Sequence, residues 1–237
     1  MVAANRDEFY SRPTAGADFW PEHPRVLAGR DLEACVTWMG ITRNGRFAAL
    51  TNFRDPASHQ PRAPSRGALV ADFLTGDASI DNYLDALEPA RYNGFNLLLG
   101  DATNHGRLVA FSNVSLERHE LAPGIYGLSN ALLDTPWPKF GAGKTALEAA
   151  LGALPDDAPL FQLLRDDTIH PDARLPATGV PLDWERLLSA AFIRSPDYGT
   201  RGSTVVTMSA GGKATFDEQT LLPGGMAGTR RRYRFGC

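Results

Sequence analysis

The chain has 237 residues, of which 43% are hydrophobic and 22% are charged, so it can bury a sizeable core like an ordinary soluble domain. Its formal net charge of −3 gives no overall positive field that would favour nucleic acid or an anionic membrane surface. No stretch approaches the ~20 apolar residues of a membrane-spanning helix, and the N-terminus lacks the basic-then-apolar pattern of a secretion signal.

The first predicted element is a strand that ends in four polar residues, Asn5, Arg6, Asp7 and Glu8, after the apolar residues 2–4. In an extended segment alternate side chains point to opposite faces, so Asn5 and Asp7 share one face and Arg6 and Glu8 the other. Amide, guanidinium and carboxylate groups at the end of one strand are typical of a prepared site. A strand that runs into a charged surface loop gives the same pattern and is, on these residues alone, the simpler interpretation.

The next part of the chain contains loops, a hairpin and two helices. Residues 14–24 are rich in proline, glycine and aromatic side chains and are predicted to form a loop. Residues 36–53 are predicted to form a β-hairpin, because Asn44-Gly45 lies between two β-prone segments and both turn positions need positive φ. After a polar loop over residues 55–64, helices are predicted for residues 65–74, with Ser65 as the N-cap, and for residues 80–88, which end before Pro89.

The second half of the chain alternates between strands and helices. Its predicted elements are a hairpin of residues 95–100 and 107–112 that turns at Asn104-His105-Gly106, strands at 117–121 and 125–128, helices at 145–154, 159–165 and 184–192, a hairpin of 203–208 and 214–218 across Gly211-Gly212, and a strand at 231–235. Strand hairpins followed by a helical stretch and further strands indicate an α+β fold with antiparallel sheets.

Short motifs along nearly the whole chain resemble the NRDE family, which is named for Asn-Arg-Asp-Glu and whose eukaryotic members are called transport and Golgi organization protein two. The resemblance implies the fold of the N-terminal-nucleophile (Ntn) hydrolases, an αββα sandwich of two antiparallel sheets flanked by helices. The motifs are Asn5-Arg6-Asp7-Glu8, Leu27-Ala28-Gly29-Arg30-Asp31, Thr37-Trp38-Met39-Gly40, Leu50-Thr51-Asn52-Phe53-Arg54-Asp55, Pro64-Ser65-Arg66-Gly67, Tyr126-Gly127-Leu128-Ser129-Asn130, Trp137-Pro138-Lys139 and Tyr198-Gly199-Thr200-Arg201.

The same resemblance implies a catalytic constellation of Arg6, Asp7, Asn52, Asn130 and Arg201, in which the asparagines would orient a nucleophile and bind a developing oxyanion. Each residue also has a structural interpretation. Arg6 and Asp7 could form an ion pair, the two asparagines could bond their own backbone, and Arg201 could support a loop. Because all five fall inside family motifs, we expect one shared pocket. The candidates for ligand binding beside them are Asn5, Glu8 and Arg12.

The nucleophile of such hydrolases is a cysteine at the mature N-terminus, whose own α-amine serves as the base. NRDE sequences typically begin Met-Cys and continue through an apolar strand to the Asn-Arg-Asp-Glu motif, whereas here Met1 directly precedes Val2. We expect that the true start lies upstream and that the first strand is truncated, since loss of a strand would expose a sheet edge and part of the core. The 237-residue form is therefore expected to be inactive as a hydrolase.

Other motifs do not predict a site. The segment Gly141-Ala142-Gly143-Lys144-Thr145 ends like a phosphate-binding loop, but Pro138 occupies the position of the required first glycine. Lys144 beside the following helix is only a weak candidate for anion binding. The arginine-rich residues 230–234 fit a solvated terminal strand better than a nucleic-acid site. No metal site is expected, because the histidines are scattered without ligand spacing, at His23, His59, His105, His119 and His170.

The two cysteines, Cys35 and Cys237, are far apart, which fits a reducing compartment and predicts a cytoplasmic single domain over residues 1–237. With the family's association with haem mobilisation and with lipid or acyl-thioester metabolism, the resemblance implies a protein that binds or traffics a small metabolite of the haem or acyl-CoA type. Haem would then be cargo and no resident cofactor is expected. The alternative is a cysteine hydrolase of linear amides or related acyl compounds, active when the chain begins with cysteine. Neither nucleic acid nor a membrane span is expected to be involved.

Overall fold

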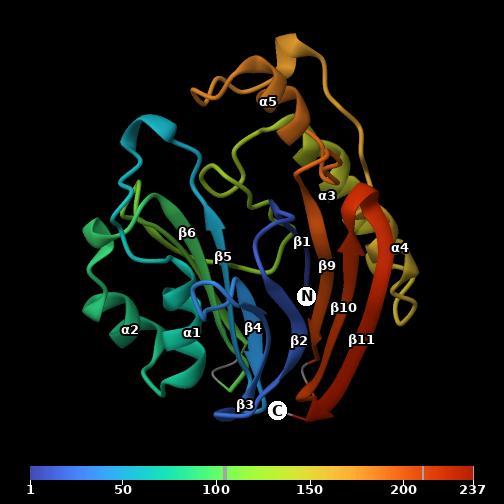
Figure 1. The fold of residues 1–237 in the computed structure, drawn as a ribbon. Coiled ribbons are helices and arrows are strands. Elements are labelled where there is room, and N and C mark those ends of the chain that lie inside the picture. Colours follow the sequence, from blue (N-terminus) through green and yellow to red (C-terminus); the bar gives the residue numbers. More distant parts are fainter. Residues whose placement is uncertain (104–105, 210, 237) are drawn as a thin grey trace.

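The computed structural model describes residues 1–103, 106–209 and 211–236. Two antiparallel sheets face each other, and helices cover their outer faces, with α1 and α2 beside one sheet and α3 and α4 beside the other (Figure 1). The smaller sheet has the strand order β1-β9-β10-β11, and the larger sheet runs in sequence order from β2 to β8. This arrangement confirms the predicted α+β class and αββα layering.

The smaller sheet joins the two ends of the chain. Its strands are β1 (Val2–Phe9), β9 (Tyr198–Met208), β10 (Lys213–Leu222) and β11 (Met226–Gly236). Strand β1 pairs with β9 and forms an edge of this sheet, with a register shift between Arg6 and Asp7. The larger sheet consists of β2 (Thr14–Trp20), β3 (His23–Asp31), β4 (Met39–Thr42), β5 (Arg46–Asn52), β6 (Phe95–Asp101), β7 (Arg107–Ser112) and β8 (Arg118–Glu120).

The helices are short and lie in two groups. Helix α1 packs on β3, β4 and β5, α2 contacts β6, and α4 contacts β9. They are α1 (Gly67–Thr75), α2 (Ile80–Ala86), α3 (Pro138–Leu151), α4 (Ala158–Leu163) and α5 (Leu182–Leu188), with single 3-10 turns at Pro56–Ser58, Pro89–Arg91, Asp172–Arg174 and Pro223–Gly225.

The hairpin predicted around Asn44-Gly45 is confirmed, but the expected positive φ at both turn positions is not: Gly45 has a φ of 81°, whereas Asn44 is not among the residues with positive φ. The prediction of a loop over residues 14–24 is wrong, because this segment contains all of β2 and the start of β3. Gly16 lies in β2 where the two sheets approach closely, so that a side chain there would meet Arg231 and Glu218 of the other sheet. The glycine inside this strand therefore leaves room for side chains of the facing sheet and does not mark a loop.

Further corrections concern the middle of the chain. The predicted strand at 125–128 belongs to neither sheet. Helix α3 begins seven residues before the predicted 145, because Pro138 is well suited to a first helical position. The N-cap position of α1 is Arg66 and not the predicted Ser65. The predicted turn residues Asn104 and His105, and Cys237, lie outside the described residues.

The buried core has three parts, one on each side of the two sheets and one between them. The largest lies between the larger sheet and helices α1 and α2, and a smaller one lies between the smaller sheet and α4. The central part joins the two sheets and contains Ala17, Leu27, Met39, Ile41, Phe47, Val206, Ala214 and Phe216.

The smaller sheet also holds a buried carboxylate, Asp217, which is held by two arginines of β11. Arg230 donates two hydrogen bonds of 2.9 Å, one to each oxygen of Asp217, and Arg232 donates another. Burial alone would raise the pKa of Asp217, but the two guanidinium groups outweigh it and hold the pKa below its ordinary value. The folded state therefore prefers the ionised form, and this stability is present above the unfolded pKa of ~3.9.

We expect Asp217→Asn to lower the free energy of unfolding at pH 7 by about 2 kcal/mol, because charge-assisted hydrogen bonds are lost. The difference from the unmodified protein should shrink as the pH falls from about 4 through the folded-state pKa of Asp217, where its carboxylate becomes protonated. Urea denaturation at a series of pH values measures this. A difference that stays constant down to pH 2 would contradict the assignment.

Candidate functional site

A cavity of about 770 Å³ lies beside the edge strand β1 and opens between the two sheets. Its walls come from β1, from the ends of β4 and β5, from the segment that precedes α1, from residues 126–130 and from the first turns of α3. This volume is within the range of small-molecule sites. Several apolar and aromatic side chains line it, among them Trp38, Met39, Leu128, Phe140 and Leu147.

Strand β1 contributes polar side chains from both of its faces, as predicted. The face that carries Arg6 turns toward the larger sheet, where the Arg6 guanidinium lies 4.2 Å from the centre of the Trp38 ring. Arg6 Nη2 is 3.9 Å from Glu8 Oε2 and 4.0 Å from Asp31 Oδ2. The Arg6 side chain is only 9% exposed, and its Nη1 is buried without a hydrogen-bond partner in the described part of the chain. Burial lowers the pKa of Arg6, so the nearby carboxylates do not fully offset the cost of removing this cation from water.

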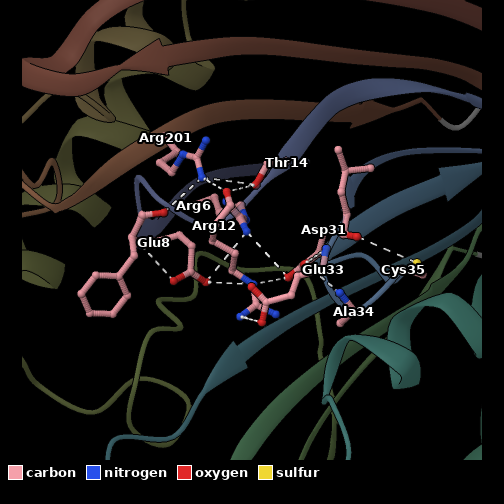
Figure 2. Close-up of polar contacts among 11 residues, drawn as sticks. Arg6, Glu8, Arg12, Thr14, Asp31, Glu33, Ala34, Cys35 and Arg201 are labelled. Carbon is pink, nitrogen blue, oxygen red and sulfur yellow. Dashed lines mark hydrogen bonds and ion pairs between the residues drawn. The ribbon is translucent and has the colours of Figure 1, made fainter.

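A network of arginines and carboxylates continues from Arg6 along this side of the cavity (Figure 2). Arg12 Nε donates a hydrogen bond of 2.6 Å to Asp31 Oδ2, and the backbone N–H groups of Glu33 and Ala34 donate to Asp31 Oδ1. Burial acts to raise the pKa of Asp31, but these hydrogen bonds prevail and lower it. Asp31 and Arg12 are thus a fixed ion pair, while Glu8 lies between the two arginines at 3.9 Å from each.

The other face of β1 carries Asn5 and Asp7. Asn5 Nδ2 donates to the carbonyl oxygens of Leu164 and Ala191, both at 2.7 Å, and its Oδ1 accepts from Ser203. Its amide is therefore occupied in tying the strand to the helical layer, although the residue also lines the cavity.

Asp7 accepts a hydrogen bond of 2.6 Å from Thr200 Oγ1. Burial raises the pKa of Asp7, against the opposing effects of this hydrogen bond and of the cations Lys139, Arg6 and Arg54. A carboxyl group with a raised pKa on a cavity wall is suited to exchanging protons with a ligand.

Asn52 and Asn130 meet at the end of β5. Asn130 Nδ2 donates to the backbone oxygen of Asn52 at 2.9 Å, and the Asn130 backbone oxygen accepts from the Arg54 N–H at 2.8 Å. Thr51 Oγ1 donates to the Ser129 oxygen at 2.5 Å, so residues 129 and 130 are fastened to this strand. The exposed Asn52 side chain makes no hydrogen bond within the described residues and is free to contact a ligand.

The expected convergence holds for four residues and not for the fifth. Arg6, Asp7, Asn52 and Asn130 line the cavity, as do the ligand-binding candidates Asn5, Glu8 and Arg12, but Arg201 does not. The Arg201 guanidinium instead donates to the backbone oxygens of Phe9 and Arg12 and to Thr14 Oγ1 (Figure 2). It stabilises the connection between β1 and β2, a structural arrangement that its place in a motif did not reveal.

Sequence reasoning missed two cations of the cavity wall, Arg66 and Lys139. Arg66 Nη1 donates to the Gly94 oxygen at 2.9 Å, and Lys139 Nζ donates to the Leu188 oxygen at 3.2 Å. Neither forms an ion pair with a carboxylate among the described residues, whereas neighbouring Lys144 lies 2.6 Å from Asp134. Burial lowers the pKa of both, and that of Lys139 to about 8. Both residues lie in motifs of the family that the sequence resembles, and their place in these motifs was the signal in the sequence that could have identified them.

Three further observations concern the described part of the chain. No group of three His, Cys, Asp or Glu side chains in residues 1–103, 106–209 and 211–236 is placed to hold a metal ion. Within the same ranges, no helix has both the length and the apolar character needed to cross a membrane. Cys35 is exposed and does not line the cavity.

Comparison with known proteins places the chain among relatives. Residues 1–223 match the family model described as Transport and Golgi organisation 2. The chain is 42% identical over 241 residues to the Transport and Golgi organization protein 2 homolog of Bos taurus, with 94% of this chain and 86% of that protein covered. It is 40% identical over 240 residues to the Homo sapiens homolog, with the same coverage, and 33% identical over 246 residues to the Drosophila melanogaster protein, with 93% and 86% covered. Among solved structures it is similar to a variant of conjugated bile acid hydrolase from Clostridium perfringens, at 12% identity and a TM-score of 0.43, covering 99% of this chain and 88% of that one.

Proposed function

The chain belongs to the Transport and Golgi organisation 2 family, and we propose that it binds a small metabolite with an anionic group and an apolar body in the cavity beside β1. Haem and acyl-CoA or related lipid-type compounds have this character. The cavity is lined both by aromatic side chains and by cations that no carboxylate of the described chain neutralises, and this observation carries the proposal.

The charges favour an anionic ligand. Arg66 and Lys139 line the cavity without an ion-pair partner among the described residues, and Arg6 Nη1 is buried with no acceptor. A cation that is removed from water without compensation is costly, so a carboxylate or phosphate placed near these groups would relieve that cost. Trp38 and Phe140 provide apolar surface for the rest of the ligand.

The test is binding of two named probes, haemin and palmitoyl-CoA, followed by calorimetry and by quenching of tryptophan fluorescence, since Trp38 lines the cavity. We expect Arg66→Met to weaken binding at least about tenfold, because a charge-assisted hydrogen bond is worth about 1.5–3 kcal/mol. Arg62→Met is the matched control, because Arg62 is exposed, lies four residues away and does not line the cavity.

The proposal fails if neither probe binds, or if both variants bind like the unmodified protein. Thermal denaturation of Arg66→Met separates a loss of binding from a loss of folding, since its hydrogen bond to the Gly94 oxygen is also removed. A folded variant with unchanged affinity would show that Arg66 does not hold the anionic group.

A second candidate function is hydrolysis of a linear amide or related acyl compound. It is supported by the placement of Arg6, Asp7, Asn52 and Asn130 on one cavity, which is the set that the resemblance to Ntn hydrolases implies. No cysteine of the described residues lines this cavity, so we propose that the 237-residue chain binds without hydrolysing. A form of the protein that begins with cysteine should cleave an amide substrate and lose the activity on replacement of that cysteine by alanine. Activity of the 237-residue chain would contradict this.

A further inference from the structure

Lys139 is the second residue of helix α3, and its side chain reaches the cavity wall. Its Nζ donates one hydrogen bond, to the backbone oxygen of Leu188. Among the described residues no carboxylate lies within ion-pair distance of Nζ, and Asp7 of β1 is the opposite charge that acts on it. The amine is thus fixed in position but is not neutralised as a cation.

The surroundings of Lys139 raise the fraction of the neutral amine above that of an ordinary lysine. The first turn of a helix carries a partial positive charge, which disfavours a cation at this position. The Arg54 guanidinium acts in the same direction, while Asp7 and the Trp137 ring, whose centre is 5.7 Å from Nζ, act against it. Burial is the largest effect, and together these groups lower the pKa of Lys139 to about 8. A desolvated lysine next to another cation is a known way to activate an amine nucleophile.

We propose that Lys139 is a reactive amine that condenses with an aldehyde or ketone in the cavity to form an imine. The electron pair of Nζ attacks the carbonyl carbon, a C–N bond forms, and the carbonyl oxygen takes up a proton to give a carbinolamine. The two protons of the neutral amine then leave with that oxygen as water, and a C=N bond remains. The reaction needs no oxidant or reductant. It goes beyond the binding proposed above because a covalent bond forms. It also requires no anionic group on the carbonyl compound.

The composition of the chain makes this reaction easy to localise, because the sequence contains only three lysines, Lys139, Lys144 and Lys213. Lys144 lines the same cavity but is paired with Asp134, and Lys213 is exposed on β10. Both serve as internal controls for the modification of Lys139. The α-amine of Met1 is a fourth reactive group, and peptide mapping distinguishes it from the three side chains.

The experiment treats the intact protein with a limiting amount of butanal and sodium cyanoborohydride, which reduces an imine to a stable secondary amine, and maps the adducts by mass spectrometry. At pH 8 about half of Lys139 is neutral, against under about 1% of an ordinary lysine. We expect Lys139 to be modified at least about tenfold faster than Lys144 or Lys213. Its rate should level off above pH 8, as the Lys139 amine becomes fully neutral.

Two variants complete the test. Lys139→Arg should abolish the fast modification, and Lys144→Arg should leave it unchanged. Equal rates at the three lysines of the unmodified protein, or slower modification of Lys139 than of Lys213, would overturn the proposal without any variant having to fold. Because butanal carries no anionic group, these outcomes are independent of whether haemin or palmitoyl-CoA binds.

Discussion

Replacing Glu185 with alanine is expected to lower the free energy of unfolding by about 3–5 kcal/mol, because it leaves a buried charge without its partner. Arg54 Nη1 donates to Glu185 Oε2 at 3.0 Å, and the two side chains are only 9% and 5% exposed. Glu185 Oε1 also accepts from the Thr178 N–H at 2.8 Å and from its hydroxyl at 2.6 Å. Alanine would leave all three donors unpaired. Urea denaturation followed by circular dichroism measures the loss.

The control for this change is Asp183→Ala, two residues away in α5. Asp183 also pairs with an arginine, Arg186, at 2.7 Å, but its side chain is 90% exposed. Exposed ion pairs contribute little, so this variant should lie within about 1 kcal/mol of the unmodified protein. Similar losses for the two variants would show that burial of the Arg54–Glu185 pair does not determine its importance.

Replacing Phe216 with alanine is expected to cost a comparable 3–5 kcal/mol, because it opens a cavity in the layer that joins the two sheets. Phe216 is 1% exposed and packs in the central part of the core with residues of both sheets, among them Ile41 and Val206. Leu222→Ala, on the same strand β10 but 48% exposed, is the matched control and should cost less than about 1 kcal/mol. The midpoint of urea denaturation compares the two.

An equal shift for both variants would contradict a core located between the sheets. A loss for Phe216→Ala with an unchanged denaturant slope would show that the folded state keeps its compactness and loses only packing energy. A lower slope would indicate that the two sheets separate before the rest of the chain unfolds.

The predictions from sequence succeeded where local chemistry decides the structure. The Asn44-Gly45 hairpin needs only its own turn residues, and the division of β1 into two faces follows from strand geometry. The α+β pattern was likewise visible in the order of the elements. The strand β2 was missed because its proline- and glycine-rich neighbourhood resembles a loop, and its glycine is explained only by the opposite sheet, which sequence cannot place.

The site was also predictable in part, but from the family motifs and not from local chemistry. Family motifs indicated Arg6, Asp7, Asn52 and Asn130, and the structure brings these four to one cavity. Arg201 was expected there too, but three acceptors around the β1–β2 connection hold its guanidinium elsewhere. Arg66 and Lys139 also lie in family motifs, but the sequence predicted no role for them. Their role depends on burial and on neighbours that are distant in the sequence.

The pairing of β1 with β9 has a consequence for the order in which the protein is made. Ala4 lies opposite Thr204, so this ladder closes a loop of roughly 200 residues, and such distant contacts are entropically expensive to form. The larger sheet needs only sequence neighbours and can assemble while the ribosome is still working. The wall that carries Arg6 and Asp7 has to wait for β9, so a nascent chain has no completed binding chamber until residues 198–208 have been made.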